Sequence, residues 1–166
     1  MIDLKRLWRH LTTGKASGRR AFPGEVLADI QKTIAEGEQL HRAEVRFIIE
    51  PAMPLDDVLD GIHPRSRART LFSDYRIWDT EENCGVLIYL NLADHQVEIV
   101  ADRGVGRLVQ AAEWQAVCDT LTSQLGQGAF RDSTVAAITQ LNELLAQKLP
   151  ATGDRVNQLS DKPIIL

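Results

Sequence analysis

The sequence predicts an α/β fold in which helices cover the faces of a mixed β-sheet. Two runs, residues 43–50 and 85–92, are apolar and rich in the residues that strands favour. A third such run, residues 96–101, follows the second so closely that the two predict a β-hairpin. Apolar residues recur at helical spacing in the segments around these runs. Because helices with an apolar face need a surface to cover, this order predicts helices packed on a sheet.

Local signals place each element in chain order. Pro23 suits a first helical turn, and the apolar residues after it recur at helical spacing as far as Leu40. The strand at residues 43–50 is closed by two prolines, which cannot donate to a sheet ladder. Pro64 can open the next helix, and the hairpin follows it. Two closing helices and an irregular tail complete the prediction, over residues 114–125, 134–149 and 150–166.

The length and composition are those of one globular domain. The 166 residues suffice for one core, and 44% hydrophobic with 25% charged residues is ordinary for a folded protein. No apolar run approaches the roughly 20 residues of a membrane-spanning helix, and the N-terminus lacks the features of a secretory signal. We therefore expect a cytoplasmic protein in which Cys84 and Cys118 are buried thiols. Its expected parts are a basic N-terminal helix with a linker, an α/β domain and an irregular tail, over residues 1–20, 21–149 and 150–166.

Charge is divided unevenly along the chain. The first 20 residues hold six basic side chains and one acidic side chain, which gives +5 and leaves −9 for the remainder of a chain whose formal net charge is −4. Nucleic-acid binding needs a basic surface that neutralises phosphates, and the acidic body gives no support to such a surface. We expect no nucleic-acid partner.

The N-terminal segment predicts a short amphipathic helix. Its apolar side chains can share one face, with the basic residues largely on the remainder. Residues 1–11 could make a peripheral contact with an anionic membrane or with a protein partner. The favoured alternative is a helix packed on its own domain, because so short an apolar face is a weak membrane anchor. Residues 12–20 are expected to form a linker. The apolar residues are Ile2, Leu4, Leu7, Trp8 and Leu11.

The most informative segment is an acidic loop just before the hairpin, residues 79–85, with the sequence DTEENCG. A two-residue turn at residues 93–94 sets the register of the hairpin and places Asp102 opposite Gly85, at the same end of the sheet as the loop. Hard cations bind clustered oxygen ligands, so these side chains predict a Ca²⁺ or Mg²⁺ site. The predicted ligands, called the acidic rim below, are Asp79, Glu81, Asn83 and Asp102.

A second interpretation of the acidic rim needs no cation. Asp and Asn are common loop residues that bond their own backbone, and nearby arginines could neutralise the carboxylates in salt bridges. The spacing matches no recognised metal motif, and Leu90 stands where the twelfth ligand of an EF-hand would be, which excludes an EF-hand. Glu44, at the start of the first strand, could be structural or could contribute to the rim. The arginines that could neutralise it are Arg65, Arg67, Arg76 and Arg103.

The stretch from Arg65 to Gly104 resembles the central signature of TPM domains. Three segments carry the resemblance: RSRA at residues 65–68, NCGVLIY at residues 83–89 and DRGV at residues 102–105. The chain is similar to the cytosolic branch of the family, which has no signal or membrane segment. The resemblance implies a compact αβα sandwich with a mixed, Rossmann-like central sheet.

The resemblance implies less about activity. TPM domains have been proposed as acid phosphatases and as Ca²⁺ binders, and others are accessory factors in the assembly or repair of membrane complexes. The family pattern places its acidic loop and its post-strand aspartate at Asp79, Glu81 and Asp102. A phosphatase would use Asp79 or Asp102 to hold a metal and Arg65 or Arg103 to hold the phosphate. The sequence shows no obvious covalent nucleophile and no phosphate-binding glycine loop.

Three functions follow, in order of preference. The first is a TPM-type accessory or interaction module with a protein partner, carrying one Ca²⁺ or Mg²⁺ ion at the acidic rim. The second is a weak metal-assisted acid phosphatase that uses the same rim. The third is an assembly factor that residues 1–11 recruit to a membrane or to a protein complex.

Overall fold

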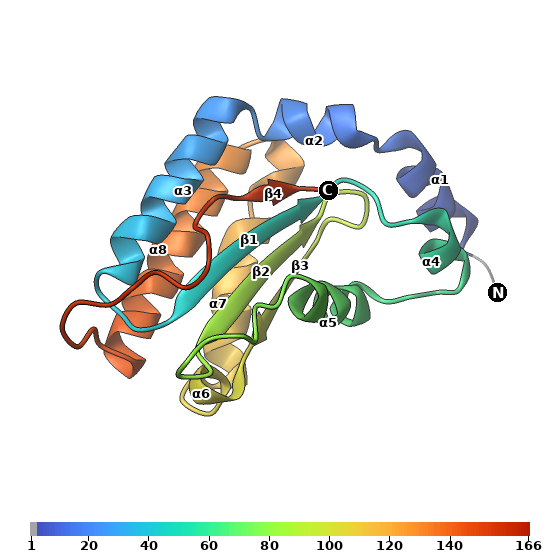
Figure 1. The fold of residues 1–166 in the computed structure, drawn as a ribbon. Helices are drawn as coiled ribbons and strands as arrows, with labels where there is room; N and C mark the ends of the chain where they lie inside the picture. Colours follow the sequence, from blue (N-terminus) through green and yellow to red (C-terminus); the bar gives the residue numbers. More distant parts are fainter. Residues whose placement is uncertain (1–2) are drawn as a thin grey trace.

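The structure, a computed structural model that describes residues 3–166, contains a four-stranded mixed sheet (Figure 1). The strand order is β3-β2-β1-β4. β1 runs parallel to both β2 and β4, whereas β2 and β3 form an antiparallel hairpin. The sheet is therefore mixed, as predicted. The strands are β1 (Glu44–Glu50), β2 (Gly85–Asn91), β3 (Gln96–Ala101) and β4 (Ile164–Ile165).

Helices cover both faces of this sheet. Three helices pack on one face, and a fourth, α5, packs on the other face against β2 and β3 (Figure 1). This arrangement confirms the predicted αβα sandwich. The three helices on the first face are α3 (Gly24–Glu38), α7 (Ala111–Thr122) and α8 (Phe130–Lys148), and α5 spans Pro64–Asp74.

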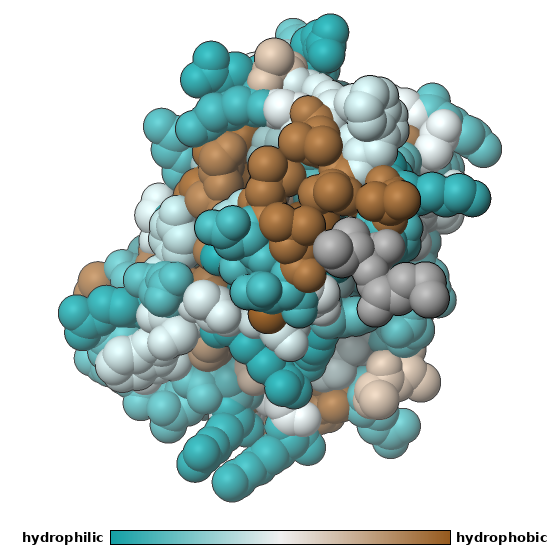
Figure 2. Space-filling view, turned by 90° about the vertical axis from the view of Figure 1, so that its right-hand side faces the viewer, coloured by the Kyte–Doolittle hydropathy of each residue, from teal (hydrophilic) through white to brown (hydrophobic). Residues whose placement is uncertain are grey.

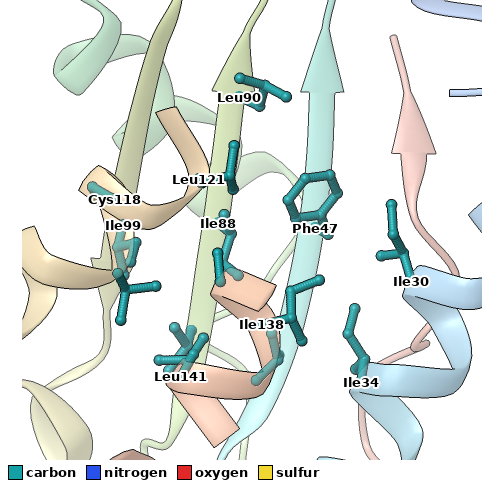
Figure 3. Close-up of a cluster of buried hydrophobic side chains, with 14 of the residues drawn as sticks. Ile30, Ile34, Phe47, Ile88, Leu90, Ile99, Cys118, Leu121, Ile138 and Leu141 are labelled. Carbon is teal, nitrogen blue, oxygen red and sulfur yellow. The ribbon is translucent and has the colours of Figure 1, made fainter. Parts of the chain in front are cut away.

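The larger core lies between the sheet and the three-helix layer (Figure 3). Phe47 of β1 and Ile88 of β2 lie there among Ile30 of α3 and Ile138 of α8, and all four side chains are fully buried. A smaller core lies under α5. Because β1 and β2 are buried on both faces, their sequences are continuous apolar runs rather than alternating ones. The smaller core contains Ile48, Ala68, Leu71, Ile77, Leu87 and Tyr89.

Local signals start the helices near the predicted positions. α5 begins at Pro64, and the His63 side chain before it accepts a hydrogen bond from the backbone N–H of Arg65 at 3.2 Å. α7 begins earlier than predicted, where the Glu113 side chain accepts a hydrogen bond from the backbone N–H of Gln110 at 2.8 Å. Such side-chain contacts satisfy backbone donors that a helix start leaves unpaired.

The structure differs from two expectations at the ends of the chain. The linker expected over residues 12–20 is largely a helix, α2 (Lys15–Ala21), which packs so tightly that a Cβ on Gly18 would lie 2.7 Å from Cγ of Pro51. The tail expected to be irregular ends in β4, which pairs with β1. Both elements depend on contacts with distant residues, which local sequence signals do not report.

The remaining elements are short. They are α1 (Leu4–Thr12), α4 (Leu55–Leu59), α6 (Arg103–Gly106) and the 3₁₀ turn η1 (Leu125–Gln127). Met1 and Ile2 lie outside the described residues, so the predicted place of Ile2 on the first helix is not described. Among residues 3–166, no helix has both the length and the apolar character needed to cross a membrane. Cys84 and Cys118 are free and buried, as predicted.

Candidate functional site

The hairpin has the predicted register. Val86 pairs with Ala101 and Asn91 pairs with Gln96, which follows from the two-residue turn. The backbone N–H of Asp102 donates to the carbonyl oxygen of Gly85 at 2.9 Å. Asp102 therefore lies at the same end of the sheet as the acidic loop.

The acidic loop and the segment after β3 touch through their backbones. The N–H of Gly104 donates to the carbonyl oxygen of Asn83 at 2.9 Å. A Cβ on Gly104 would collide with the carbonyl oxygens of Glu82 and Asn83, so only glycine permits this close approach. Asn83 itself has φ +51°, in the left-handed region that Asn tolerates better than most residues. The loop is thus held beside Asp102 by main-chain contacts.

Within the acidic rim, the side chains of Asp79 and Asp102 have separate partners. Asp79 forms an ion pair with Arg76 at 2.7 Å, in which both side chains are more than half exposed. Asp102 accepts a hydrogen bond from the backbone N–H of Arg103 at 2.6 Å and so caps α6. Glu81 is exposed and is linked to the tail through its backbone N–H, which donates to Gln158. Within the described part of the chain, no three carboxylate, imidazole or thiol groups lie close enough to hold a metal ion together.

Of the four arginines proposed to neutralise the rim, only Arg76 forms an ion pair with a rim residue among residues 3–166. Arg65 binds Glu98 at 3.3 Å and also donates to the carbonyl oxygen of Ile99, which places it halfway along β3. Arg67 lies at the opposite end of the sheet, and Arg103 is exposed beside Asp102. Of the two arginines proposed to hold a phosphate, the structure therefore brings only Arg103 to the rim.

Two further acidic residues, Glu82 and Glu44, lie at this end of the sheet outside the acidic rim. Glu82 forms ion pairs with Arg42 at 2.5 Å and Arg155 at 3.3 Å, so it ties the loop to the C-terminal segment. Glu44 accepts hydrogen bonds from the backbone N–H groups of Gln158 and Leu159. Burial raises the pKa of Glu44 despite these bonds. These bonds join the C-terminal segment to the start of β1, which supports the structural alternative of the two that the sequence left open.

A second polar cluster lies at the opposite end of β1 and β2. The carboxylate of Glu50 is almost fully buried and accepts from Arg67 Nη2 at 2.7 Å and from the Tyr89 hydroxyl at 2.5 Å. Asn91 Nδ2 donates to the same hydroxyl at 3.0 Å, and Asn91 Oδ1 accepts from the backbone N–H of Asp94 at 2.8 Å. Burial and the Glu50 charge raise the pKa of Tyr89, so the hydroxyl remains a donor. These five residues are called the buried network below.

Asp94 connects the buried network to the N-terminal helix. Arg6 donates to both of its carboxylate oxygens, at 2.9–3.1 Å, and Arg9 Nη2 lies 3.4 Å from Oδ1. His10 Nε2 lies 3.2 Å from Oδ1, while His10 Nδ1 accepts from the backbone N–H of Met53. Burial alone would raise the pKa of Asp94, but the hydrogen bonds and the charge of the Arg6 guanidinium hold it below its usual value. One ionised carboxylate therefore anchors the helix.

This anchoring turns α1 so that three of its apolar side chains, Leu4, Trp8 and Leu11, face solvent. Arg6 and His10 lie inside, whereas Leu4 and Trp8 are 72% and 67% exposed. The helix packs on its own domain, as favoured above, but through its polar side. Leucines of the adjacent α4 are exposed as well, and Figure 2 shows apolar side chains gathered on one face of the molecule. We define the α1–α4 apolar surface as Leu4, Trp8, Leu11, Leu55 and Leu59.

The sequence contains a signal for this orientation. Residues 6, 9 and 10 are basic and stand at helical spacing, so they share one face of α1. Three basic side chains on one face of a helix indicate an acidic partner. Asp94 stands in the hairpin turn, 88 residues after Arg6, and the sequence does not connect the two.

These observations define the protein as an αβα domain whose sheet has three parallel strands, β4, β1 and β2, and one antiparallel edge strand, β3. The family model of the TPM domain matches residues 20–144, which is most of the chain. The chain belongs to the TPM domain family.

A solved structure has a similar fold. It is the NMR structure of BA42 protein from the psychrophilic bacterium Bizionia argentinensis, with a TM-score of 0.77 and 24% sequence identity over 87% of this chain and 94% of that chain. At this identity the similarity shows the fold alone. No curated protein matches the sequence.

Proposed function

We propose that this TPM domain is an accessory interaction module that docks on a protein partner through the α1–α4 apolar surface. The observation that carries the proposal is the exposure of Trp8 together with its leucine neighbours, although the same helix has polar residues that could have faced solvent. Contiguous exposed apolar surfaces of this kind mark interaction sites in folded proteins. Trp is also enriched among the residues that dominate binding energy at interfaces.

The charges around the α1–α4 apolar surface favour a protein over a membrane. Lys5 and Arg9 on α1 are exposed, and so are Asp56 and Asp60 on α4. A polar rim of both signs around an apolar centre is the usual anatomy of a protein interface. An anionic membrane would attract the two basic residues but repel the aspartates and the acidic body of the domain.

The anchoring of α1 also favours binding. The Arg6 and His10 contacts with Asp94 hold the helix in place before a partner arrives. A preorganised surface loses less conformational entropy on association than a flexible segment does. The buried network thus holds α1, and with it the α1–α4 apolar surface, in place through Asp94.

The proposal is tested by photo-crosslinking from within the surface. A photoreactive amino acid is placed at Trp8 or at Leu59, and a control is placed at Lys32, an exposed residue of α3 outside the surface. We expect both surface positions to crosslink to the same protein, with no such product from Lys32. Trp8→Glu should then weaken binding of the purified partner by at least about 10-fold, while Lys32→Glu should leave it unchanged.

Other occupants of the α1–α4 apolar surface give different results. Crosslinks only between copies of this chain, with a Trp8-dependent dimer in sedimentation, would assign the surface to self-association. Trp8-dependent sedimentation with anionic liposomes would assign it to a membrane. Either result contradicts docking on a separate protein partner.

A second candidate function, binding of Ca²⁺ or Mg²⁺ at the acidic rim, is supported by the contact between the loop and the segment after β3. The Gly104–Asn83 hydrogen bond brings Asp102 beside the loop that carries Asp79, Glu81 and Asn83. A cation there would require the exposed side chains of the loop to move toward Asp102, so that their oxygens act as ligands together. A metal-assisted phosphatase would need this cation first, with Arg103 as the phosphate partner.

This second candidate is tested by titrating Ca²⁺ and Mg²⁺ while following amide shifts by NMR. Saturable shifts at residues 79–85 and 102, abolished by Asp102→Asn, would support a cation site and justify phosphatase assays. Shifts that survive Asp102→Asn, or no shifts at either cation, would exclude the rim as the site.

A further inference from the structure

A cavity lies beyond the carboxyl end of β2. It is open to solvent, its volume is about 570 Å³, and it is lined by residues of α2, the start of α3, the hairpin turn, η1 and the start of α8. In open α/β sheets, ligands bind outside the carboxyl ends of the parallel strands. The volume falls within the range of small-molecule sites, roughly 300–1,000 Å³. The cavity is separate from both the acidic rim and the α1–α4 apolar surface.

The wall of the cavity is mainly apolar. Phe130 of α8 and Val26 of α3 lie on neighbouring helices, and Leu92 follows β2 directly. These side chains leave the cavity able to accept an apolar group of a ligand but not a fully polar one. The complete apolar lining is Ala21, Pro23, Val26, Leu92, Leu125 and Phe130.

The polar groups at the cavity carry positive or neutral charge. Arg20, Arg131 and His95 line it, and no aspartate or glutamate does, although the chain as a whole has a net charge of −4. Arg131 is already paired with Asp29 at 2.7 Å. Arg20 has no ion pair or side-chain hydrogen bond within residues 3–166. One cationic group therefore remains available for a ligand.

We propose that this cavity binds a small amphipathic anion: an apolar body lying on the Val26–Phe130 wall and one carboxylate paired with Arg20. A guanidinium binds a carboxylate through two parallel N–H donors, which fixes the orientation of the ligand. A single carboxylate matches the one arginine without a partner. A dianionic phosphate would leave half of its charge without a counterion.

Octanoate is the probe, and amide shifts of the full-length protein measured by NMR are the readout. We expect saturable shifts around Ala21, Leu92 and His95. Acetate lacks the apolar body and octanol lacks the charge, so both should bind at least about 10-fold more weakly. Octyl phosphate has the same apolar chain but a phosphate head group in place of the carboxylate. It should also bind more weakly than octanoate.

The neighbouring residues Arg19 and Arg20 provide a matched pair of variants. Both are exposed arginines of α2, but only Arg20 lines the cavity. Arg20→Gln should weaken octanoate binding by about 10-fold or more, because a charge-assisted hydrogen bond is lost. Arg19→Gln changes the net charge by the same amount but removes no group that lines the cavity, so binding should stay within about twofold of that of the unaltered protein.

Four results would overturn the assignment. Absence of shifts with octanoate would exclude the ligand class. Equal binding of octanol or of acetate would show that one half of the ligand plays no part. Equal weakening by both arginine variants would show a general effect of charge, and tighter binding of octyl phosphate would assign the site to a phosphate ligand.

Discussion

The acidic rim and the buried network lie at opposite ends of the central sheet and hold their carboxylates in opposite ways. At the amino end of β1 and β2, three side chains of the acidic rim are exposed and Asp102 is half-buried. Asp79 and Asp102 bind separate partners, Arg76 and the backbone N–H of Arg103. At the carboxyl end, Glu50 and Asp94 are buried carboxylates that bind several donors at once. The segment of the sequence richest in acidic residues, the loop at residues 79–85, is therefore not the place where the structure buries Glu50 and Asp94.

The difference has an energetic meaning. An exposed ion pair is screened by water and contributes little to stability, about 0–1 kcal/mol. A buried carboxylate must be satisfied, because removing its partners or removing the carboxylate itself leaves a desolvated charge. We therefore expect the carboxyl end of the sheet to be sensitive to substitution and the side chains of the acidic rim to be tolerant.

The largest expected effect is that of Glu50→Ala. It leaves Arg67 without its main partner and Tyr89 without its acceptor, so the free energy of unfolding should fall by about 3–5 kcal/mol. Tyr89→Phe removes the hydroxyl's two hydrogen bonds, to Glu50 and from Asn91, but leaves the Glu50–Arg67 pair in place, so it should cost about 1–2 kcal/mol. Urea denaturation of both variants measures this difference. Equal small losses would show that the buried network does not stabilise the fold.

Gly104→Ala tests whether the acidic rim depends on close backbone packing rather than on its charges. The added Cβ would push against the carbonyl oxygens of Glu82 and Asn83, so we expect a loss of about 1–3 kcal/mol in urea denaturation. Gly126→Ala is the control, because a Cβ there meets no atom within 4 Å. A neutral Gly104→Ala variant would mean that the loop moves away at little cost.

Asp94→Asn tests the anchoring of α1. The amide cannot accept from Arg6 as a charged carboxylate does, so we expect the amides of α1 to lose hydrogen-exchange protection equivalent to about 2 kcal/mol. The exchange of β1 and β2 amides should change less. Uniform loss of protection throughout the domain would show that α1 does not open as a separate unit.

The same anchor predicts a dependence on pH. The pKa of Asp94 is lower in the folded protein than its usual value of 3.8. Its stabilising contribution is therefore fully present above about pH 4 and is lost as the pH falls through the lowered pKa. Protection of α1 should be constant from pH 7 to pH 5 and should decline below pH 4. A decline already near pH 6 would require a different group.

The smallest expected effect is that of Asp79→Asn. Its ion pair with Arg76 is exposed, so the free energy of unfolding should change by less than about 0.5 kcal/mol, and less still in 1 M salt. Thermal unfolding at low and high salt measures this change. A loss above about 2 kcal/mol would mean that the acidic rim is as strongly coupled to the fold as the buried network is.

Much of the fold could be predicted because its signals are local. The apolar runs at residues 43–50 and 85–92 are strands, and the short turn between β2 and β3 sets the register that places Asp102 opposite Gly85. The helix α2 and the strand β4 could not be predicted in the same way. Gly18 packs against Pro51, and β4 pairs with β1, so both depend on contacts over long separations in sequence.

The features of the candidate sites also divide into those with local signals and those that depend on contacts between distant residues. The sequence by itself determined the family, the layers of the fold and the meeting of the acidic loop with Asp102, because periodicity, turn length and motif spacing are properties of neighbouring residues. Only the tertiary structure decided which face of α1 is buried. An amphipathic pattern shows that the two faces of a helix differ but not which one is buried. In α1 the basic face is turned inward because Arg6 pairs with Asp94, a buried carboxylate 88 residues away in the sequence.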